Sequence, residues 1–215
     1  MTSTGTPTRK PDGAPSTAKG GRTRQRILEA AAELIYRQGA AATTIQDVRD
    51  AAGVSASQLY HYFADKQALV RAVVEYQGAR MLASQEAAGV DSLEALRRWR
   101  DQLVAHQDQI LGGCPLGALA GEVADTDPAG RVIAAGEFDR WRASIARGLT
   151  RMRDRGELQG DTNADDLAIA LLAALQGGLM LSYVTQSSDP LKKALDAMIA
   201  LVETSSAPRD DADAS

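Results

Sequence analysis

Residues 43–66 have the sequence TTIQDVRDAAGVSASQLYHYFADK, which predicts two short helices separated by a sharp turn. Thr44 and Asp47 are three residues apart, as the two partners of a capping box at a helix N-terminus are. Gly53 follows the last residue of this helix, where glycine adopts a left-handed backbone at little cost. We therefore expect a helix-turn-helix. The apolar face of its first helix comprises Ile45, Val48, Ala51 and Ala52.

The second helix of this stretch begins with another capping box, formed by Ser55 and Gln58, and directs Leu59 and Phe63 inward. Its outer side carries small or hydrogen-bonding groups, which suit a helix that enters a DNA major groove. Gln58 can pair bidentately with adenine, while hydroxyl groups and Lys66 can hold phosphates. The predicted DNA-binding residues are Thr43, Thr44, Ser55, Ala56, Ser57, Gln58, Tyr60, His61, Tyr62 and Lys66. The alternative is an αα-hairpin whose polar face binds no nucleic acid.

The longer run from Thr23 to Lys66 resembles the three-helix DNA-binding domain of TetR-family transcriptional regulators over its full length. The resemblance rests on Ile27, Ala31, Gly39, Thr43-Thr44-Ile45, Ala52-Gly53-Val54, Leu59-Tyr60, Phe63 and Lys66. It implies a homodimer that binds a palindromic operator in double-stranded DNA, acts as a repressor and is released by a small-molecule effector. One departure is that His61 precedes Tyr62, where many relatives have a tyrosine followed by a histidine.

The chain of 215 residues, 44% of them hydrophobic, is long enough for a small domain joined to a larger helical one. We expect residues 22–66 to form the helix-turn-helix domain and residues 67–204 a helical ligand-binding and dimerisation domain. Residues 1–21 and the acidic residues 205–215 are expected to be disordered tails. The first tail contains Arg9, Lys10 and Lys19. Its alternative role is that of a basic arm that contacts DNA.

The charge is distributed unevenly along the chain. Residues 1–71 hold 10 Lys and Arg against 6 Asp and Glu, a net charge of +4, whereas residues 72–215 hold 14 against 22, a net charge of −8. Since DNA is a polyanion, we expect it to bind the basic part and to bind less tightly as salt increases.

The larger domain is predicted to be helical throughout, because no segment shows the alternation of a β-strand. One helix is expected to run from Leu93 through Ile110 to Gly112-Gly113, a short apolar helix to follow Pro115, and a third to start at Asp127-Pro128 and end near Gly156. The segment GCPLG at 113–117, followed by Leu119 and Glu122, resembles the C-terminal domain of the LmrA/YxaF-like subgroup of TetR regulators.

Two apolar helices near the C-terminus are the expected dimer interface. Between Leu167 and Leu181 only Gln176 is clearly polar, and these fifteen residues are fewer than the ~20 that a bilayer span needs. We therefore expect no membrane span. The last helix carries Leu191, Leu195, Met198 and Val202 at helical spacing. The resemblance implies that the helices at about 164–187 and 190–204 pair with their copies in a four-helix bundle.

An effector pocket is predicted within the larger domain, lined by Leu103, Gln107, Leu116, Leu119, Phe138, Trp141, Ile145, Gln176, Met180 and Tyr183. For the apolar members, core packing is the alternative. Gln107, Gln176 and Tyr183 are more informative, because a polar group among apolar neighbours needs a partner. The absence of a charge from the set predicts an apolar or weakly polar ligand.

The sequence offers little for catalysis. It contains two histidines, His61 and His106, a single cysteine, Cys114, and no phosphate-binding loop, metal-binding cluster or hydrolase motif. We therefore expect no catalytic residue, no metal and no cofactor. A lone cysteine fits a cytoplasmic chain without structural disulfides, and packing or redox sensing are its two possible roles. The alternative to a regulator is a helical small-molecule carrier or a structural dimer whose helix-turn-helix domain (the head) does not bind DNA.

Overall fold

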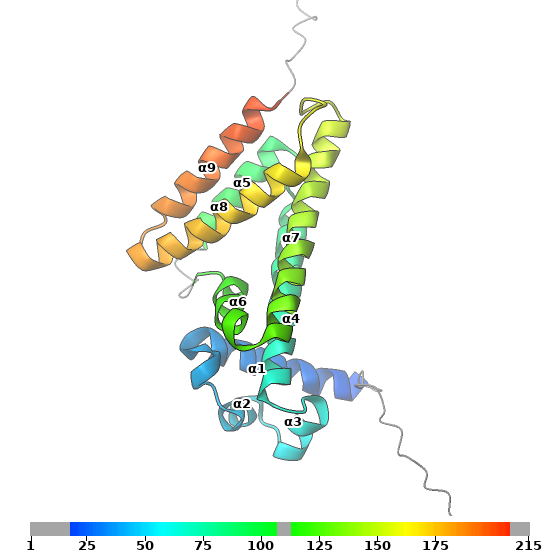
Figure 1. Cartoon of the computed structure of the whole chain (residues 1–215), viewed down its shortest axis with the longest axis vertical. Coiled ribbons are helices and arrows are strands. Elements are labelled where there is room, and N and C mark those ends of the chain that lie inside the picture. The colour runs from blue at the N-terminus through cyan, green and yellow to red at the C-terminus, as the bar shows by residue number, and fades with distance from the viewer. Residues whose placement is uncertain (1–17, 107–112, 207–215) are drawn as a thin grey trace, which may run out of the picture. The chain divides into compact units, whose positions relative to one another are not determined.

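The computed structural model describes residues 18–106 and 113–206, and every regular element in these two ranges is a helix (Figure 1). This confirms the all-α class expected from the sequence. The chain divides after Val70 into two compact units.

The first unit contains α1 (Ala18–Ala42), α2 (Ile45–Ala52), α3 (Ala56–Tyr62) and the first turn of α4 (Lys66–Ala88). Helix α1 begins four residues before the expected start at Arg22, so the prediction of a disordered tail through residue 21 was wrong for residues 18–21. Once a helix is nucleated, each added residue costs only its own ordering, which explains how α1 can extend.

Gly39 breaks the regular path of α1, with φ 83° and ψ 158° inside the helix. The Thr43 hydroxyl donates to the Gly39 carbonyl at 2.8 Å, and the Thr43 N–H donates to the same oxygen at 3.3 Å. These two bonds hold the last residues of α1 and the start of its connection to α2.

In the core of the first unit, α1 packs on α2. Ile27, Val48 and Leu59 are almost completely buried, and Phe63 is 3% exposed. Ala51, predicted on the apolar face of α2, is exposed instead. At 100° per residue it lies on the opposite flank of Val48 from Ala52, which is buried.

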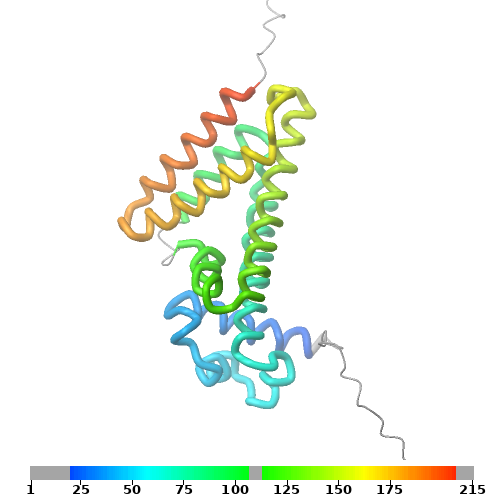
Figure 2. The backbone as a smooth tube through the Cα atoms, in the orientation of Figure 1, coloured from blue at the N-terminus to red at the C-terminus, as the bar shows by residue number. Residues whose placement is uncertain are grey.

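The second unit holds the rest of α4 together with five further helices. These are α5 (Leu93–Ala105), α6 (Pro115–Thr126), α7 (Pro128–Asp154), α8 (Ala164–Thr185) and α9 (Asp189–Thr204). Helix α8 packs on both α7 and α9, α6 packs on α7, and α5 packs on α9 (Figure 2). Helices α8 and α9 approach closely at Gly178, where an added Cβ would lie 2.9 Å from the Leu191 Cα.

The boundaries of these helices correct some expectations. Helix α5 ends at Ala105 rather than at Gly112, because the His106 N–H and ring both bond to the Gln102 carbonyl and close the last turn. Ile110 and Gln107 lie outside the described residues. Helix α7 starts at Pro128 as expected and ends two residues before Gly156, whose φ is 75°.

The length of α8 and the start of the C-terminal tail also differ from what was expected. Helix α8 is 22 residues long, and an 18-residue window reaches a mean hydropathy of 1.9, so length and composition alone would allow a membrane span. A core helix of a bundle passes the same test, and α8 is packed on α7 and α9. The tail does not begin at Ser205: its carbonyl accepts from the Gln159 N–H at 2.8 Å, which ties it to the loop before α8.

Candidate functional site

Both capping boxes predicted in the helix-turn-helix are present. At the start of α2, the Asp47 N–H donates to the Thr44 hydroxyl at 3.1 Å, and the Thr44 N–H donates to Asp47 Oδ2 at 2.9 Å. Hydrogen bonds from the Thr44 side chain and backbone lower the pKa of Asp47, so the box is held by a carboxylate. Gly53 has the left-handed backbone expected at the turn, with φ 63°.

The box at the start of α3 engages the residue that was expected to read a base. The Gln58 N–H donates to Ser55 Oγ at 3.2 Å, and the Ser55 N–H donates to Gln58 Oε1 at 2.9 Å. A bidentate contact with adenine uses the same amide oxygen. Because this oxygen has two lone pairs, it would either accept from both the Ser55 N–H and adenine or leave the cap to bind the base.

The remaining predicted DNA-binding residues occupy three environments. Thr44, Ser55, Ser57, Gln58, Tyr60 and His61 are exposed, whereas Ala56, Tyr62 and Lys66 are half-buried and Thr43 is buried. Thr43 bonds to Gly39, and Lys66 Nζ donates to the Ala41 carbonyl at 3.0 Å. These two side chains hold the α1–α2 connection. Contacts of either with DNA remain predictions.

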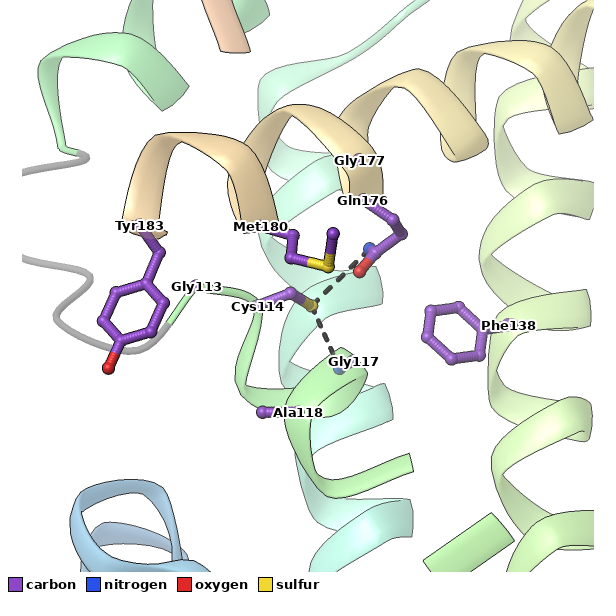
Figure 3. Close-up of a pocket in the computed structure, with 9 residues that line it drawn as sticks. All are labelled: Gly113, Cys114, Gly117, Ala118, Phe138, Gln176, Gly177, Met180 and Tyr183. Carbon is purple, nitrogen blue, oxygen red and sulfur yellow. Dashed lines mark hydrogen bonds between the residues drawn. The ribbon is translucent and has the colours of Figure 1, made fainter. Parts of the chain in front are cut away.

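A cavity of about 430 Å³ lies in the second unit, where the N-terminal end of α6 meets α7 and α8 (Figure 3). Its walls are Gly113, Cys114, Gly117, Ala118, Phe138, Gln176, Gly177, Met180 and Tyr183. Four of the ten predicted ligand-binding residues are among them: Phe138, Gln176, Met180 and Tyr183.

The other predicted residues lie elsewhere. Leu116, Leu119, Trp141 and Ile145 are buried in the core, where their alternative role of packing applies. Leu103 is half-buried on α5 and does not line the cavity, and Gln107 is outside the described residues. Helical spacing identifies an inward face but does not separate residues that fill the core from residues that border a space.

Five residues of the wall were not predicted, and most of them are glycine or alanine. They border the cavity because they have little or no side chain to fill it. Cys114 is the N-cap of α6: its Sγ accepts from the Gly117 N–H at 3.3 Å and from Gln176 Nε2 at 3.5 Å. The GCPLG segment, which resembles the LmrA/YxaF-like subgroup, contributes three of these residues.

The chemistry of the cavity favours an uncharged ligand. No Asp, Glu, Lys, Arg or His lines it. Burial raises the pKa of the Cys114 thiol, so this group is held in its neutral form. Among the described residues there is no group of three His, Cys, Asp or Glu that could hold a metal ion. The polar groups left for a ligand are the Gln176 amide and the Tyr183 hydroxyl.

A bidentate ion pair connects α4 with the start of α7. Arg71 Nε and Nη2 each donate to one carboxylate oxygen of Asp127 at 2.6 Å, and the Asp127 side chain is 8% exposed. Asp127 is both the last cap of α6 and the first of α7. The pair therefore ties α4 to the helix whose other end, at Cys114, borders the cavity.

Substitution of Asp127 by Asn should lower the free energy of unfolding at neutral pH, because a carboxylate paired with Arg71 is lost while the side-chain volume is kept. The hydrogen bond from Arg71 holds the pKa of Asp127 below its ordinary value of 3.8. A carboxyl whose pKa is lowered by folding contributes stability above the unfolded pKa and loses it as the pH falls through the folded one.

Urea unfolding of the parent protein and Asp127→Asn, at about pH 7 and about pH 3, measures this. We expect the stability difference between the two proteins to be largest at neutral pH and to shrink in acid. A difference of the same size at both pH values would show that the Asp127 charge contributes no net stability.

The geometry defines a class of protein: a capped helix-turn-helix followed by a helical body is the arrangement of a DNA-binding regulator. Comparison with known families agrees. The family of bacterial regulatory proteins of the tetR type matches residues 27–73, and the tetracyclin repressor-like C-terminal domain matches residues 89–198. The chain belongs to the TetR family of transcriptional regulators, which are not enzymes.

Three relatives and one solved structure illustrate the match. An uncharacterised HTH-type regulator of Mycobacterium tuberculosis is 31% identical over 78% of this chain and 88% of its own. YxaF of Bacillus subtilis is 27% identical over 80% and 90%, and the repressor DhaR of a Mycobacterium species is 22% identical over 80% and 88%. A TetR regulator from Chloroflexus aurantiacus superimposes with a TM-score of 0.75, at 26% identity, over 88% of this chain and 98% of its own. The expected likeness to YxaF is thus confirmed.

Proposed function

We propose that the protein is a cytoplasmic, homodimeric repressor that binds a palindromic operator through α3 and leaves it when an uncharged small molecule occupies the cavity. The observation that carries the proposal is α3 itself. Its N-terminus is capped by a complete box, and Ser57, Gln58, Tyr60 and His61 are exposed on its outer face. A rigid helix with such a face is what base readout in a major groove requires.

The exposed apolar side of α8 supports a dimer. Ile169, Met180, Leu181 and Val184 are each at least half exposed, and Leu201 on the neighbouring α9 is 47% exposed. No ionisable side chain interrupts α8 from Leu167 to Ser182. A second copy presents the same surface, so two α8–α9 pairs related by a two-fold axis would form a four-helix bundle.

Two-fold symmetry then gives the operator its form. Two copies of α3 related by a two-fold axis contact two half-sites of opposite orientation, about one turn of DNA or somewhat more apart. Repression is supported by DhaR, a repressor among the relatives, and a dimer that occupies an operator would block polymerase without contacting it.

The path from the cavity to the head follows α6 and α4. The N-cap of α6, Cys114, lines the cavity, and its C-cap is Asp127, whose carboxylate accepts from Arg71 of α4. Helix α4 extends without interruption back to Lys66 in the helix-turn-helix unit. A ligand that shifts α6 would thus alter the support of α4. Each tenfold loss of operator affinity requires about 1.4 kcal/mol of coupling between ligand and DNA.

Selection of random duplex DNA on the purified protein tests the DNA-binding proposal, and variants of Gln58 sharpen it. We expect the parent protein to enrich a palindrome. Gln58→Ala should lose about 1–3 kcal/mol of operator affinity and relax one symmetric base position. Gln58→Glu keeps an oxygen for the Ser55 N–H and so preserves the cap, but it cannot donate to adenine. Since a carboxylate accepts from the amino group of cytosine, this variant should enrich cytosine there.

The two Gln58 variants also distinguish a loss of folding stability from a loss of base recognition. Urea unfolding of both variants shows whether a loss of affinity follows a loss of stability, because only Gln58→Ala removes the side-chain half of the box, the bond from the Ser55 N–H. If Gln58→Glu enriches the same bases as the parent protein, Gln58 does not read a base. If the parent protein enriches no sequence with or without small molecules, the head does not recognise DNA. The alternative function, a small-molecule carrier or structural dimer, is then favoured.

A further inference from the structure

The open side of the cavity coincides with the exposed side of α8. Met180 is 62% exposed and Tyr183 45% exposed, although both line the cavity. Figure 3 shows Met180 and Gln176 projecting from α8 toward Cys114, with Phe138 on α7 across the cavity. On the side of Met180 and Tyr183, the cavity of a single chain lacks a complete wall.

The wall residues of α8 belong to a longer apolar stripe. Ile169, Ala173, Gly177, Met180 and Val184 recur at intervals of three or four residues, so they lie on one side of the helix. All of them are exposed except Gly177, which is half-buried. Gly177 and Met180 are therefore shared between the cavity wall and the surface that supports dimerisation.

We propose that the cavity is completed by α8 of a second copy of this chain, so that effector binding and dimerisation are thermodynamically linked. The inference rests on the dimer of the proposed function and adds that the partner closes the binding site. Any molecule that fills the cavity beside Met180 would contact the stripe of the partner.

The stripe itself argues for a second copy as the occupant. It is uncharged over its whole length, so a partner with a charged or strongly polar surface would leave its own groups unpaired. The small residues Ala173 and Gly177 at its centre allow the backbone of another helix to approach closely. An identical stripe meets both conditions, and exposed Leu201 of α9 widens the apolar surface beside it.

Linkage has a reciprocal consequence. If dimerisation strengthens binding in the cavity by some factor, an occupant of the cavity strengthens dimerisation by the same factor. A dimer whose sites are closed by its own interface would thus respond to its effector as one unit, with both heads affected together.

The single cysteine provides a direct reporter of closure. Cys114 is the one thiol in the chain and lies in the cavity wall. The uncharged disulfide 4,4′-dithiodipyridine reacts with it by thiolate attack, which forms a mixed disulfide and releases 4-thiopyridone, whose absorbance gives the rate. Analytical ultracentrifugation under the same conditions gives the fraction of dimer.

Two charged substitutions at exposed positions form a matched pair. Ile169 lies in the stripe, is 50% exposed and does not line the cavity, whereas Val132 on α7 is 70% exposed and lies outside the stripe. We expect Ile169→Glu to be monomeric and its Cys114 to react roughly 5- to 150-fold faster than in the dimer, the span of ordinary coupling free energies. Val132→Glu should match the parent protein in both measurements.

A dilution series of the unmodified protein repeats the test without a substitution, and the rate should rise at the concentration where the dimer dissociates. If Ile169→Glu is a folded monomer but Cys114 reacts at the parent rate, the proposed dimer interface is supported. The partner then does not close the cavity. If the parent protein sediments as a monomer, or Ile169→Glu remains a dimer, the proposed interface is wrong and the inference fails with it. Sedimentation and thiol rates thus separate the two failures.

Discussion

Gly148→Ala should lower the free energy of unfolding by about 1–3 kcal/mol, the usual cost of an overpacked core. An added Cβ at Gly148 on α7 would lie 2.6 Å from the Val90 carbonyl oxygen and 3.0 Å from its carbon. Both are backbone atoms just after the end of α4, so they cannot move aside as a flexible side chain can. The methyl group must therefore displace α7 or the α4–α5 connection.

Gly136→Ala on the same helix is the matched control. Nothing lies within 4 Å of a Cβ built at Gly136. In the absence of a clash, replacing a helical glycine by alanine stabilises by roughly 0.5–1 kcal/mol, because the unfolded chain loses freedom. Urea unfolding followed by circular dichroism should thus show opposite signs for the two substitutions. Stabilisation by both would mean that α7 does not approach Val90 this closely.

Val184→Glu should weaken operator binding by about 10²- to 10⁴-fold, because a head that binds alone loses the effective concentration that its partner provides. Val184 is 71% exposed at the end of the α8 stripe. In the proposed dimer, this position would bury an unpaired carboxylate in an apolar interface, which is costly. Fluorescence anisotropy on the selected operator, together with sedimentation, measures both the affinity and the oligomeric state.

Val132→Glu controls for the added charge in this experiment too. Val132 is 70% exposed, nearly the same as Val184, but it lies on α7 away from the stripe. It adds the same negative charge and should leave affinity and dimerisation almost unchanged. If both substitutions weakened operator binding equally, the effect would come from net charge, and if neither did, the dimer interface would lie elsewhere.

The helix-turn-helix could be predicted in detail because its determinants are local. The capping boxes join residues three positions apart, and Gly53 adopts the left-handed backbone of the turn because it has no side chain. Both features can therefore be recognised in a short stretch of sequence. Pro128 at the start of α7 and Gly156 just after its end mark that helix in the same way. Local steric and hydrogen-bonding preferences decide such features before any tertiary contact forms.

The candidate sites were predicted less completely. Gln58 was expected both to cap α3 and to read a base, and only the structure shows that one amide oxygen serves the cap. Thr43 and Lys66 appeared as DNA contacts, yet their hydrogen bonds to carbonyl groups depend on how residues 39–41 bend back, which no short pattern reports. The environment of each side chain had to be known before its role could be assigned.

The sequence by itself determined the all-helical class, the capped helix-turn-helix and the positions of most helix starts, because hydrophobic period, caps and breakers act over a few residues. Only the tertiary structure decided where a space remains between helices. Gly113, Gly117 and Gly177 border the cavity through the side chains they lack, whereas Leu116 and Ile145 fill the core. A cavity is a property of several helices packed together, so no single helix carries its pattern.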